Sequence, residues 1–164
     1  MPDHQEDIQK LGEMIKDIRI AMLTTRDEDG TLRSRPMGTQ SAEFDGTLWF
    51  FTHASSPKVD EVEESHQVNV AYSDPNRQRY VSVSGWASIV RDRAKMEQLW
   101  EKPLEAFFPK GLNDPDIALI RVAVEKAEYW DGPPSKVVML VGFAKAKLTG
   151  HPFHPGENEK ISLK

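Results

Sequence analysis

The sequence predicts a mainly β fold of the α+β class, in which an antiparallel sheet or small barrel carries peripheral helices. Strand-like segments follow one another with turn signals between them, and helical patterns stand near the beginning, in the middle and near the end of the chain. The gaps between successive strands are too short for repeated parallel crossovers. No internal repeat or linker divides the sequence, so we expect one domain over residues 1–150 and a polar, poorly ordered tail over residues 151–164.

The first elements are read from apolar spacing and turn residues. Apolar residues recur at helical intervals over 7–18, which predicts an amphipathic helix, and a short buried strand follows at 21–25. The segment 31–44 has extended character. Asp45-Gly46 is a two-residue hairpin signal, so we expect this segment to pair with the next strand, at 47–52.

The rest of the chain continues the alternation of strands and helices. Serine followed by proline is typical of a helix start, and glycine after an apolar helical pattern is typical of a helix end. The remaining elements are predicted in this order: a helix from Pro57 to about Ser65, strands at 68–73 and 80–90, a helical segment at 91–100, a loop with a short helical turn at 102–116, a strand at 119–130 and a C-terminal helix that ends at Gly150.

Composition narrows the classes of function. The 164 residues include 21 basic and 26 acidic side chains, which give a net charge of −5, and no cysteine, which excludes disulfides, thiolate metal sites and cysteine nucleophiles. The acidic balance argues against binding to nucleic acid or to an anionic membrane surface. No apolar run approaches the ~20 residues of a spanning helix, and the polar, acidic start does not resemble a targeting peptide. We therefore expect a cytoplasmic protein with neither nucleic acid nor membrane as a partner.

A helix start with two hydroxyls and a lysine is the most informative local pattern. Ser55, Ser56 and Lys58 surround the first turn of the helix predicted from Pro57. The first N–H groups of a helix have no internal partner and the helix dipole is positive there, so this arrangement can bind an anion. A plain helix cap beside a surface lysine is the alternative interpretation, and the pattern taken alone favours it, because most such helix starts bind nothing.

An arginine on the preceding extended segment strengthens the anion interpretation. If this segment pairs with the next strand, Arg35 approaches the same helix start and offers a planar fork to a phosphate. Pro36 removes a ladder donor and Gly38 allows a flat ligand close to the backbone. The alternative is an edge strand in which proline blocks aggregation.

Three other patterns carry weaker signals. Tyr129 and Trp130 end a predicted strand, where aromatic rings can flank a planar ligand or close the core. The acidic run at 60–64 is interpreted as a solvated helix face. His151 and His154 have a suggestive spacing but stand in the polar tail without a fixed helix, so no metal site is predicted.

Four motifs, in this order and spacing, resemble the pyridoxamine 5′-phosphate oxidase-like superfamily of FMN-binding split barrels, and most of all its general stress protein 26 branch. The motifs are Ser34-Arg35-Pro36-Met37, Trp49-Phe50-Phe51-Thr52 with Ser56-Pro57-Lys58, Val81-Ser82-Val83-Ser84-Gly85-Trp86-Ala87, and Glu128-Tyr129-Trp130-Asp131-Gly132. The likeness extends from the first helix to about Gly150. It implies a six-stranded antiparallel split β-barrel that forms a homodimer, with one FMN in each of two clefts between the subunits.

The resemblance also implies which residues bind the cofactor. Arg35 and Lys58 would hold the phosphate with hydroxyl donors beside them, Pro36 and Met37 would lay backbone along the isoalloxazine edge, and Trp130 would come from the partner subunit. Tyr80 takes the position of a glutamine near the flavin in the true oxidases. The full set expected at the cofactor is Arg35, Pro36, Met37, Phe51, Thr52, Ser55, Ser56, Lys58, Tyr80 and Trp130.

Departures from the true oxidases bear on the activity. Pro57 stands where those enzymes place a second basic residue, and Lys136-Val137-Val138 replaces the Arg-x-His element that binds their substrate. We therefore do not expect pyridoxamine phosphate as the substrate. The expected function is that of an FMN-binding general stress protein, with FAD as the alternative cofactor, acting as a flavin-dependent oxidoreductase on an unidentified small molecule.

The sequence leaves two other functions open. No residue presents itself as an acid–base catalyst, so a non-enzymatic flavin carrier or stress sensor is the main alternative. A dimerisation module with an empty cleft is a third, and the presence of Arg35, Ser56 and Lys58 argues against it. In either flavin-binding case the redox chemistry belongs to the cofactor, and the protein positions it.

Overall fold

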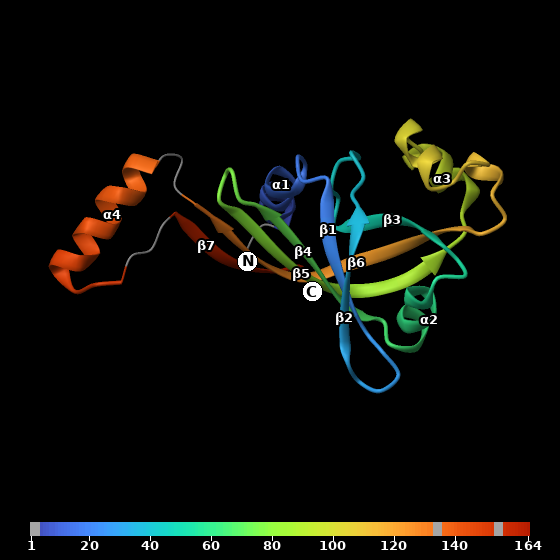
Figure 1. Cartoon of the computed structure of the whole chain (residues 1–164), viewed down its shortest axis with the longest axis horizontal. Helices are drawn as coiled ribbons and strands as arrows, with labels where there is room; N and C mark the ends of the chain where they lie inside the picture. Colours follow the sequence, from blue (N-terminus) through green and yellow to red (C-terminus); the bar gives the residue numbers. More distant parts are fainter. Residues whose placement is uncertain (1–3, 133–135, 153–155) are drawn as a thin grey trace.

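Figure 1 shows a computed structural model of the chain, which describes residues 4–132, 136–152 and 156–164. Antiparallel strands form one sheet of seven, with helices at its periphery. In chain order the elements are α1 (His4–Ile15), β1 (Ile20–Arg26), β2 (Leu32–Gly38), β3 (Thr47–His53), α2 (Pro57–Glu64), β4 (Gln67–Asp74), β5 (Arg79–Val90), α3 (Arg93–Leu99), two 3-10 turns (Lys102–Ala106 and Gly111–Asn113), β6 (Ile117–Asp131), α4 (Lys136–Thr149) and β7 (Glu157–Ser162). The predicted mainly β class with peripheral helices is confirmed.

The helix signals of the sequence are confirmed with small shifts in their bounds. α1 begins three residues earlier than predicted and buries Leu11, Met14 and Ile15. α2 begins at Pro57 behind an extended N-cap, as the serine and proline predict. α4 ends before Gly150, whose φ of +72° is the left-handed conformation that glycine adopts readily after a helix.

The strand order differs from the sequence prediction at one point. The strands run β2-β1-β4-β5-β6-β3, and β7 pairs with β6. The expected hairpin between 31–44 and 47–52 is wrong, because β2 pairs with β1 and β3 pairs with β6. The tight turn at 27–30 commits β2 to β1. Gly46 still turns the chain, with φ +109°, but its carbonyl accepts a hydrogen bond from the Val124 N–H of β6 at 3.0 Å and directs β3 towards β6.

The C-terminal tail holds a strand that the sequence did not predict. β7 pairs antiparallel with β6, from Lys126↔Ser162 to Asp131↔Glu157, and makes a seventh strand where six were expected. Of its six residues, Ile161 alone is buried, so β7 lacks the alternation of apolar residues by which strands are recognised. Residues 157–162 are therefore ordered mainly by backbone pairing with β6, which no local sequence pattern reveals.

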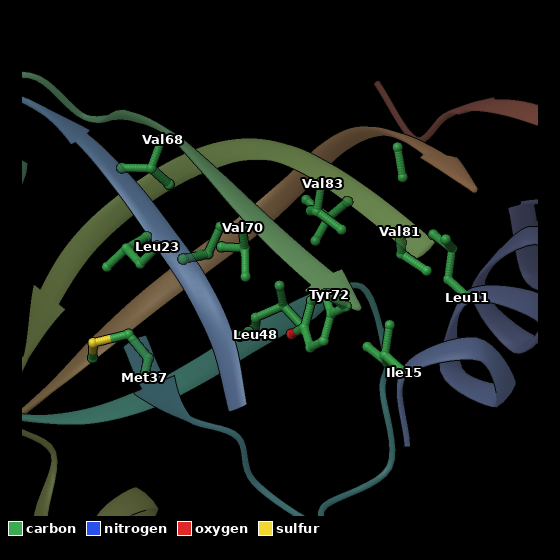
Figure 2. Close-up of a cluster of buried hydrophobic side chains, with 14 of the residues drawn as sticks. Leu11, Ile15, Leu23, Met37, Leu48, Val68, Val70, Tyr72, Val81 and Val83 are labelled. Carbon is green, nitrogen blue, oxygen red and sulfur yellow. The ribbon is translucent and has the colours of Figure 1, made fainter. Parts of the chain in front are cut away.

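The main core lies on one face of the sheet, which we call the core face. Leu23, Val70 and Val83 lie side by side on it in neighbouring strands, and α1 covers part of it with Leu11 and Ile15 (Figure 2). Their near-complete burial follows from the alternation of side chains along each strand, which puts every second residue on this face. The opposite face is called the outer face.

Helix α4 stands apart from the rest of the molecule. It projects beyond one end of the sheet, between β6 and β7 in the chain (Figure 1). Among the side chains of α4 that the structure describes, the large apolar ones that are exposed are Leu140, Val141, Phe143 and Leu148. Within the described part of the chain, no helix has both the length and the apolar character that crossing a membrane requires.

Candidate functional site

Strands β1 and β2 and helix α2 converge at one end of the core face. In the β1–β2 ladder, Leu23 lies opposite Arg35 and Thr25 lies opposite Arg33. Residues directly opposite in an antiparallel pair share a face, so both arginines of β2 point to the core face. α2 closes this end of the sheet with its buried Val62. The arginines therefore meet the side chains of α2.

A buried carboxylate on α2 receives these arginines. Glu61 is 5% exposed. Its Oε2 accepts hydrogen bonds from Thr25 Oγ1 at 2.5 Å and Arg35 Nη2 at 2.8 Å, and its Oε1 accepts one from Arg33 Nη1 at 3.1 Å. Arg35 Nη1 also donates to Thr25 Oγ1. We call these four residues, Thr25, Arg33, Arg35 and Glu61, the Glu61 cluster.

The arginines keep Glu61 ionised despite its burial. Burial acts to raise the pKa of Glu61, but the Thr25 hydrogen bond and the charge and hydrogen bond of Arg35 outweigh it, with the Arg33 charge adding to them. The pKa of Glu61 therefore lies below its ordinary value. A carboxylate that stays charged and is fully hydrogen-bonded acts as a fixed structural anion rather than as a proton donor.

The start of α2 lies beside the Glu61 cluster. The hydroxyl of the N-cap residue, Ser56, makes no capping hydrogen bond, and its Oγ instead accepts one from Lys58 Nζ at 2.9 Å. Burial and then the nearby Arg35 charge lower the pKa of Lys58, and the Glu61 charge opposes them. Arg35 and Lys58 therefore lie close enough to repel each other, at a helix start whose dipole has the same sign.

Three cations gather around one buried carboxylate beside the start of α2. Arg33, Arg35 and Lys58 surround the single buried carboxylate of Glu61. The half-exposed Asp27 lies 3.8 Å from Arg33 Nη1, at the rim of the group. Among these five residues the three cations outnumber the two anions, although the whole chain carries −5. Such an excess is what an anionic ligand needs.

Two of the predicted hydroxyl donors are engaged elsewhere. Ser55 Oγ donates to Asp116 Oδ2 at 2.7 Å, and this hydrogen bond is the main reason that the pKa of Asp116 lies below its usual value. Thr52 is 3% exposed, and its hydroxyl donates to the His53 carbonyl at 3.4 Å. Ser56 is thus the predicted hydroxyl that lies in contact with Lys58.

The predicted apolar neighbours of the ligand are used in packing. Met37 is buried in the main core, whereas Pro36 is exposed on the outer face of β2. Phe51 belongs to a second apolar cluster with α3 and the turns that follow it, and its ring meets Trp100 edge-on at 5.7 Å between centroids. The side chains of Met37 and Phe51 are therefore engaged in packing and leave little of their surface for a ligand.

Tyr80 and Trp130, which we call the aromatic pair, lie on the other face of the sheet. They are direct partners in the β5–β6 ladder and are 40% and 41% exposed. Their neighbours Val81 and Tyr129 point into the core, so the aromatic pair is on the outer face. β6 is four strand steps from β2, about 19 Å along the sheet. Within one chain, therefore, Arg35 and the aromatic pair do not meet.

Sequence reasoning missed three residues of the cluster. The acidic run at 60–64 was expected to be a solvated face, which is wrong for Glu61 because α2 packs that side chain against β1 and β2. Arg33 could have been found, because it stands two residues before Arg35 and so shares its strand face. Thr25 gave no signal, since a buried hydroxyl in an apolar strand is recognised only with its partner.

Two other features of the molecule do not coincide with the predicted site. A hollow of about 1080 Å³ between α1 and the loop before β3 is lined by none of the ten residues expected at the cofactor. Among the described residues, no group of three or more histidine and acidic side chains is arranged to hold a metal ion. His154 lies outside the described residues, and nothing is described of the side chains at 136–138.

The chain is similar to known proteins both in sequence and in fold. A family model described as pyridoxamine 5′-phosphate oxidase like matches residues 6–154. Protein bli-3 of Neurospora crassa is 30% identical over 165 residues, covering 94% of this chain and 79% of that protein. The solved general stress protein 26 of Jannaschia sp. CCS1 superposes with a TM-score of 0.77 at 24% identity, over 99% of this chain and 100% of that chain.

A second solved structure is similar at higher identity. The general stress FMN/FAD binding protein of Xanthomonas citri superposes with a TM-score of 0.66 at 28% identity, over 77% of this chain and 89% of that chain. Since the family model spans most of the sequence and the curated relative matches nearly all of it, this chain belongs to the pyridoxamine 5′-phosphate oxidase-like family.

Proposed function

We propose that this chain binds FMN, with its phosphate held by Arg35, Lys58 and Ser56 at the start of α2, and that it functions as a homodimeric flavin-dependent oxidoreductase. The observation that carries the proposal is the concentration of cations beside that helix start. A phosphate monoester carries −1.5 to −2 charges near pH 7, so it would offset the repulsion between Arg35 and Lys58. The Xanthomonas citri relative is described as an FMN/FAD binding protein, which supports a flavin as the ligand.

The residues present fit the phosphate end of such a ligand. Arginine offers a planar fork, lysine a point charge, and the Ser56 hydroxyl, free of a capping role, a third polar group. A bound flavin would supply the redox chemistry. The chain would hold the phosphate through Arg35 and Lys58 and keep the ring against the β2 backbone near Pro36 and Met37.

A second copy of the chain would complete the site. The aromatic pair is on the outer face and Arg35 is on the core face, so one flavin can meet both only if they come from different copies. The outer face also exposes the large apolar side chains of Ile20, Met22, Tyr80, Trp130 and Trp86, although the His66 ring stacks on Trp86. Exposed apolar residues gathered on one face are typical of an interface. We therefore propose a homodimer with two flavin clefts.

A flavin carrier or stress sensor without turnover is the second candidate. It is favoured by the charge state of Glu61, because a buried carboxylate held ionised by arginines offers no proton to a substrate. The replacement of the Arg-x-His element by Lys136-Val137-Val138 also removes the substrate-binding group expected of the true oxidases. The composition supports a cytoplasmic location for either candidate.

Spectroscopy of the purified protein tests these proposals. We expect the protein to carry, or to acquire from added FMN, the visible absorbance band of a bound flavin; titrations with FMN and FAD side by side give the preferred cofactor. A protein that stays colourless and does not quench FMN fluorescence would overturn both flavin functions. For the enzyme we expect NAD(P)H to reduce the bound flavin faster than free FMN, whereas an equal rate would favour the carrier.

A further inference from the structure

We propose that Glu61 and Thr25 are positioning residues, which hold the Arg35 guanidinium in the orientation that grips the flavin phosphate. The inference rests on the proposed function and assigns a role to a group that this function leaves unexplained. Glu61 is an ionised carboxylate three residues from Lys58, at a site proposed for an anion, and it would repel that anion. A role other than contact with the anion is therefore needed to explain Glu61 at this site.

The hydrogen bonds of the Glu61 cluster indicate that this role is to orient Arg35. Arg35 donates through Nη2 to Glu61 and through Nη1 to Thr25, and Thr25 itself donates to the same Glu61 oxygen. These three groups form a closed triangle. A guanidinium has five N–H donors, so a triangle that uses two of them fixes the plane of the group and leaves donors for a phosphate.

The position of Arg35 in the sheet makes it useful to restrain this side chain before a ligand binds. β2 is an edge strand, so among the described strands it pairs with β1 on one side and with none on the other. A long side chain at an edge loses rotational freedom when it binds a ligand, which weakens binding. Arg35 is only 18% exposed in its side chain, against 53% for Arg33, so the triangle has already ordered Arg35.

Arg33 balances the charge that Glu61 introduces. Glu61 Oε1 is bound by Arg33 at 3.1 Å, and Oε2 is bound by Thr25 and Arg35. Arg33, which also faces Asp27 at 3.8 Å, therefore shares the negative charge of Glu61 with Arg35. With Asp27 counted, Arg33, Arg35 and Lys58 exceed the two carboxylates by one positive charge, which remains for a phosphate that carries up to about two negative charges.

The test compares FMN with riboflavin, which lacks the phosphate, in variants of the two positioning residues. We expect Glu61→Gln and Thr25→Val to weaken FMN binding about tenfold, while riboflavin binding changes less than about twofold. Thr25→Ser keeps the hydroxyl and loses the methyl group, so it should bind FMN within about threefold of the wild type. If Thr25 acted only by packing, Thr25→Ser, which loses the methyl group, should instead be more harmful than Thr25→Val, which keeps the shape of the side chain.

Several results would overturn the inference. FMN binding that is unchanged or tighter in Glu61→Gln would mean that Glu61 acts only as a repelling charge. Equal losses for FMN and riboflavin would mean that the variants disturb the scaffold. A wild type that binds neither flavin would overturn the proposed function and the inference together, whereas normal wild-type binding with unaffected variants overturns the inference alone.

A second measurement does not depend on flavin. In ¹⁵N spectra of the flavin-free protein, the side-chain N–H signals of Arg35, assigned by their loss in Arg35→Lys, should exchange slowly with water. They should exchange much faster in Thr25→Val than in Thr25→Ser. Rapid exchange of these signals in the wild type would show that the triangle does not hold Arg35, and this readout also decides the matter if Glu61→Gln fails to fold.

Discussion

The Glu61 cluster and the aromatic pair differ in how far one chain completes them. In the cluster, each oxygen of the buried Glu61 has a partner within the same chain. Tyr80 and Trp130 are direct partners in the β5–β6 ladder, yet both remain about two-fifths exposed. The difference suggests that the phosphate grip is preformed in each subunit, and that the face meeting the flavin ring is finished only when two subunits assemble.

The largest expected effect concerns the Glu61 cluster, the half of the site that is preformed in each subunit. Arg35→Ala should lower the free energy of unfolding by about 3 kcal/mol, because it leaves the buried Glu61 with fewer charged partners. Urea unfolding measures this change. The matched control is Arg19→Ala, at an exposed arginine of the segment between α1 and β1, which should change stability by less than about 0.5 kcal/mol. Equal stability of the two variants would contradict a structural charge network at Glu61.

Lys58 separates ligand binding from stability within the same half. Lys58→Ala should weaken FMN binding by about 2 kcal/mol through loss of a charge-assisted contact, while leaving the unfolding free energy nearly unchanged. Flavin fluorescence titration measures the affinity. Lys16→Ala, at an exposed lysine just after α1, removes the same charge away from the site. An equally large loss of FMN affinity in Lys16→Ala would mean that the effect of Lys58→Ala comes from net charge alone.

The aromatic pair is expected to behave in the opposite way. Trp130→Ala should weaken the homodimer by more than about 1 kcal/mol and lower FMN affinity, because an exposed aromatic ring contributes energy mainly when a partner covers it. Sedimentation equilibrium measures the association. Phe107→Ala, at an aromatic residue that is 68% exposed beside the first 3-10 turn, is the control and should leave association unchanged.

Mixing two variants tests directly whether subunits share a site. Lys58→Ala and Trp130→Ala protein, unfolded and refolded together, should form mixed dimers in which one cleft carries both substitutions and the other carries neither. High-affinity FMN binding should then return at about one site in four. No recovery on mixing, with both variants folded and dimeric, would place Lys58 and Trp130 in the same cleft of one subunit or in unrelated sites.

The same two regions mark how far the sequence predicts the molecule. Ser56-Pro57 predicted the start of α2, and apolar alternation predicted β5 and β6, because capping and burial leave local patterns. The partner of β2 was mispredicted, since Asp45-Gly46 reports a turn but not the strand to which it leads. β7 escaped notice because its pairing with β6 needs only one buried side chain. Glu61 looked solvated because its arginine partners stand 26 and 28 residues away.

The smallest expected effect is a pH dependence that separates Glu61 from the surface carboxylates. The folded-state pKa of Glu61 lies below its ordinary value of 4.5, so its contribution to stability is complete above that value and is lost as the pH falls through the folded pKa. Glu61→Gln removes this contribution. On acidification below about pH 4.5, the free energy of unfolding of the wild type should therefore fall more steeply than that of Glu61→Gln.

Exposed carboxylates give the control for that measurement. The pKa of Asp17 is also lowered, chiefly by its hydrogen bond with Arg77, but this pair lies in solvent and should be screened by salt. Asp17→Asn should thus leave the acid slope almost unchanged at about 0.15 M salt. Parallel acid slopes for the wild type and Glu61→Gln would mean that Glu61 is not held ionised by Arg33 and Arg35. The preformed half of the site would then need its ligand to order it, as the aromatic half needs its partner.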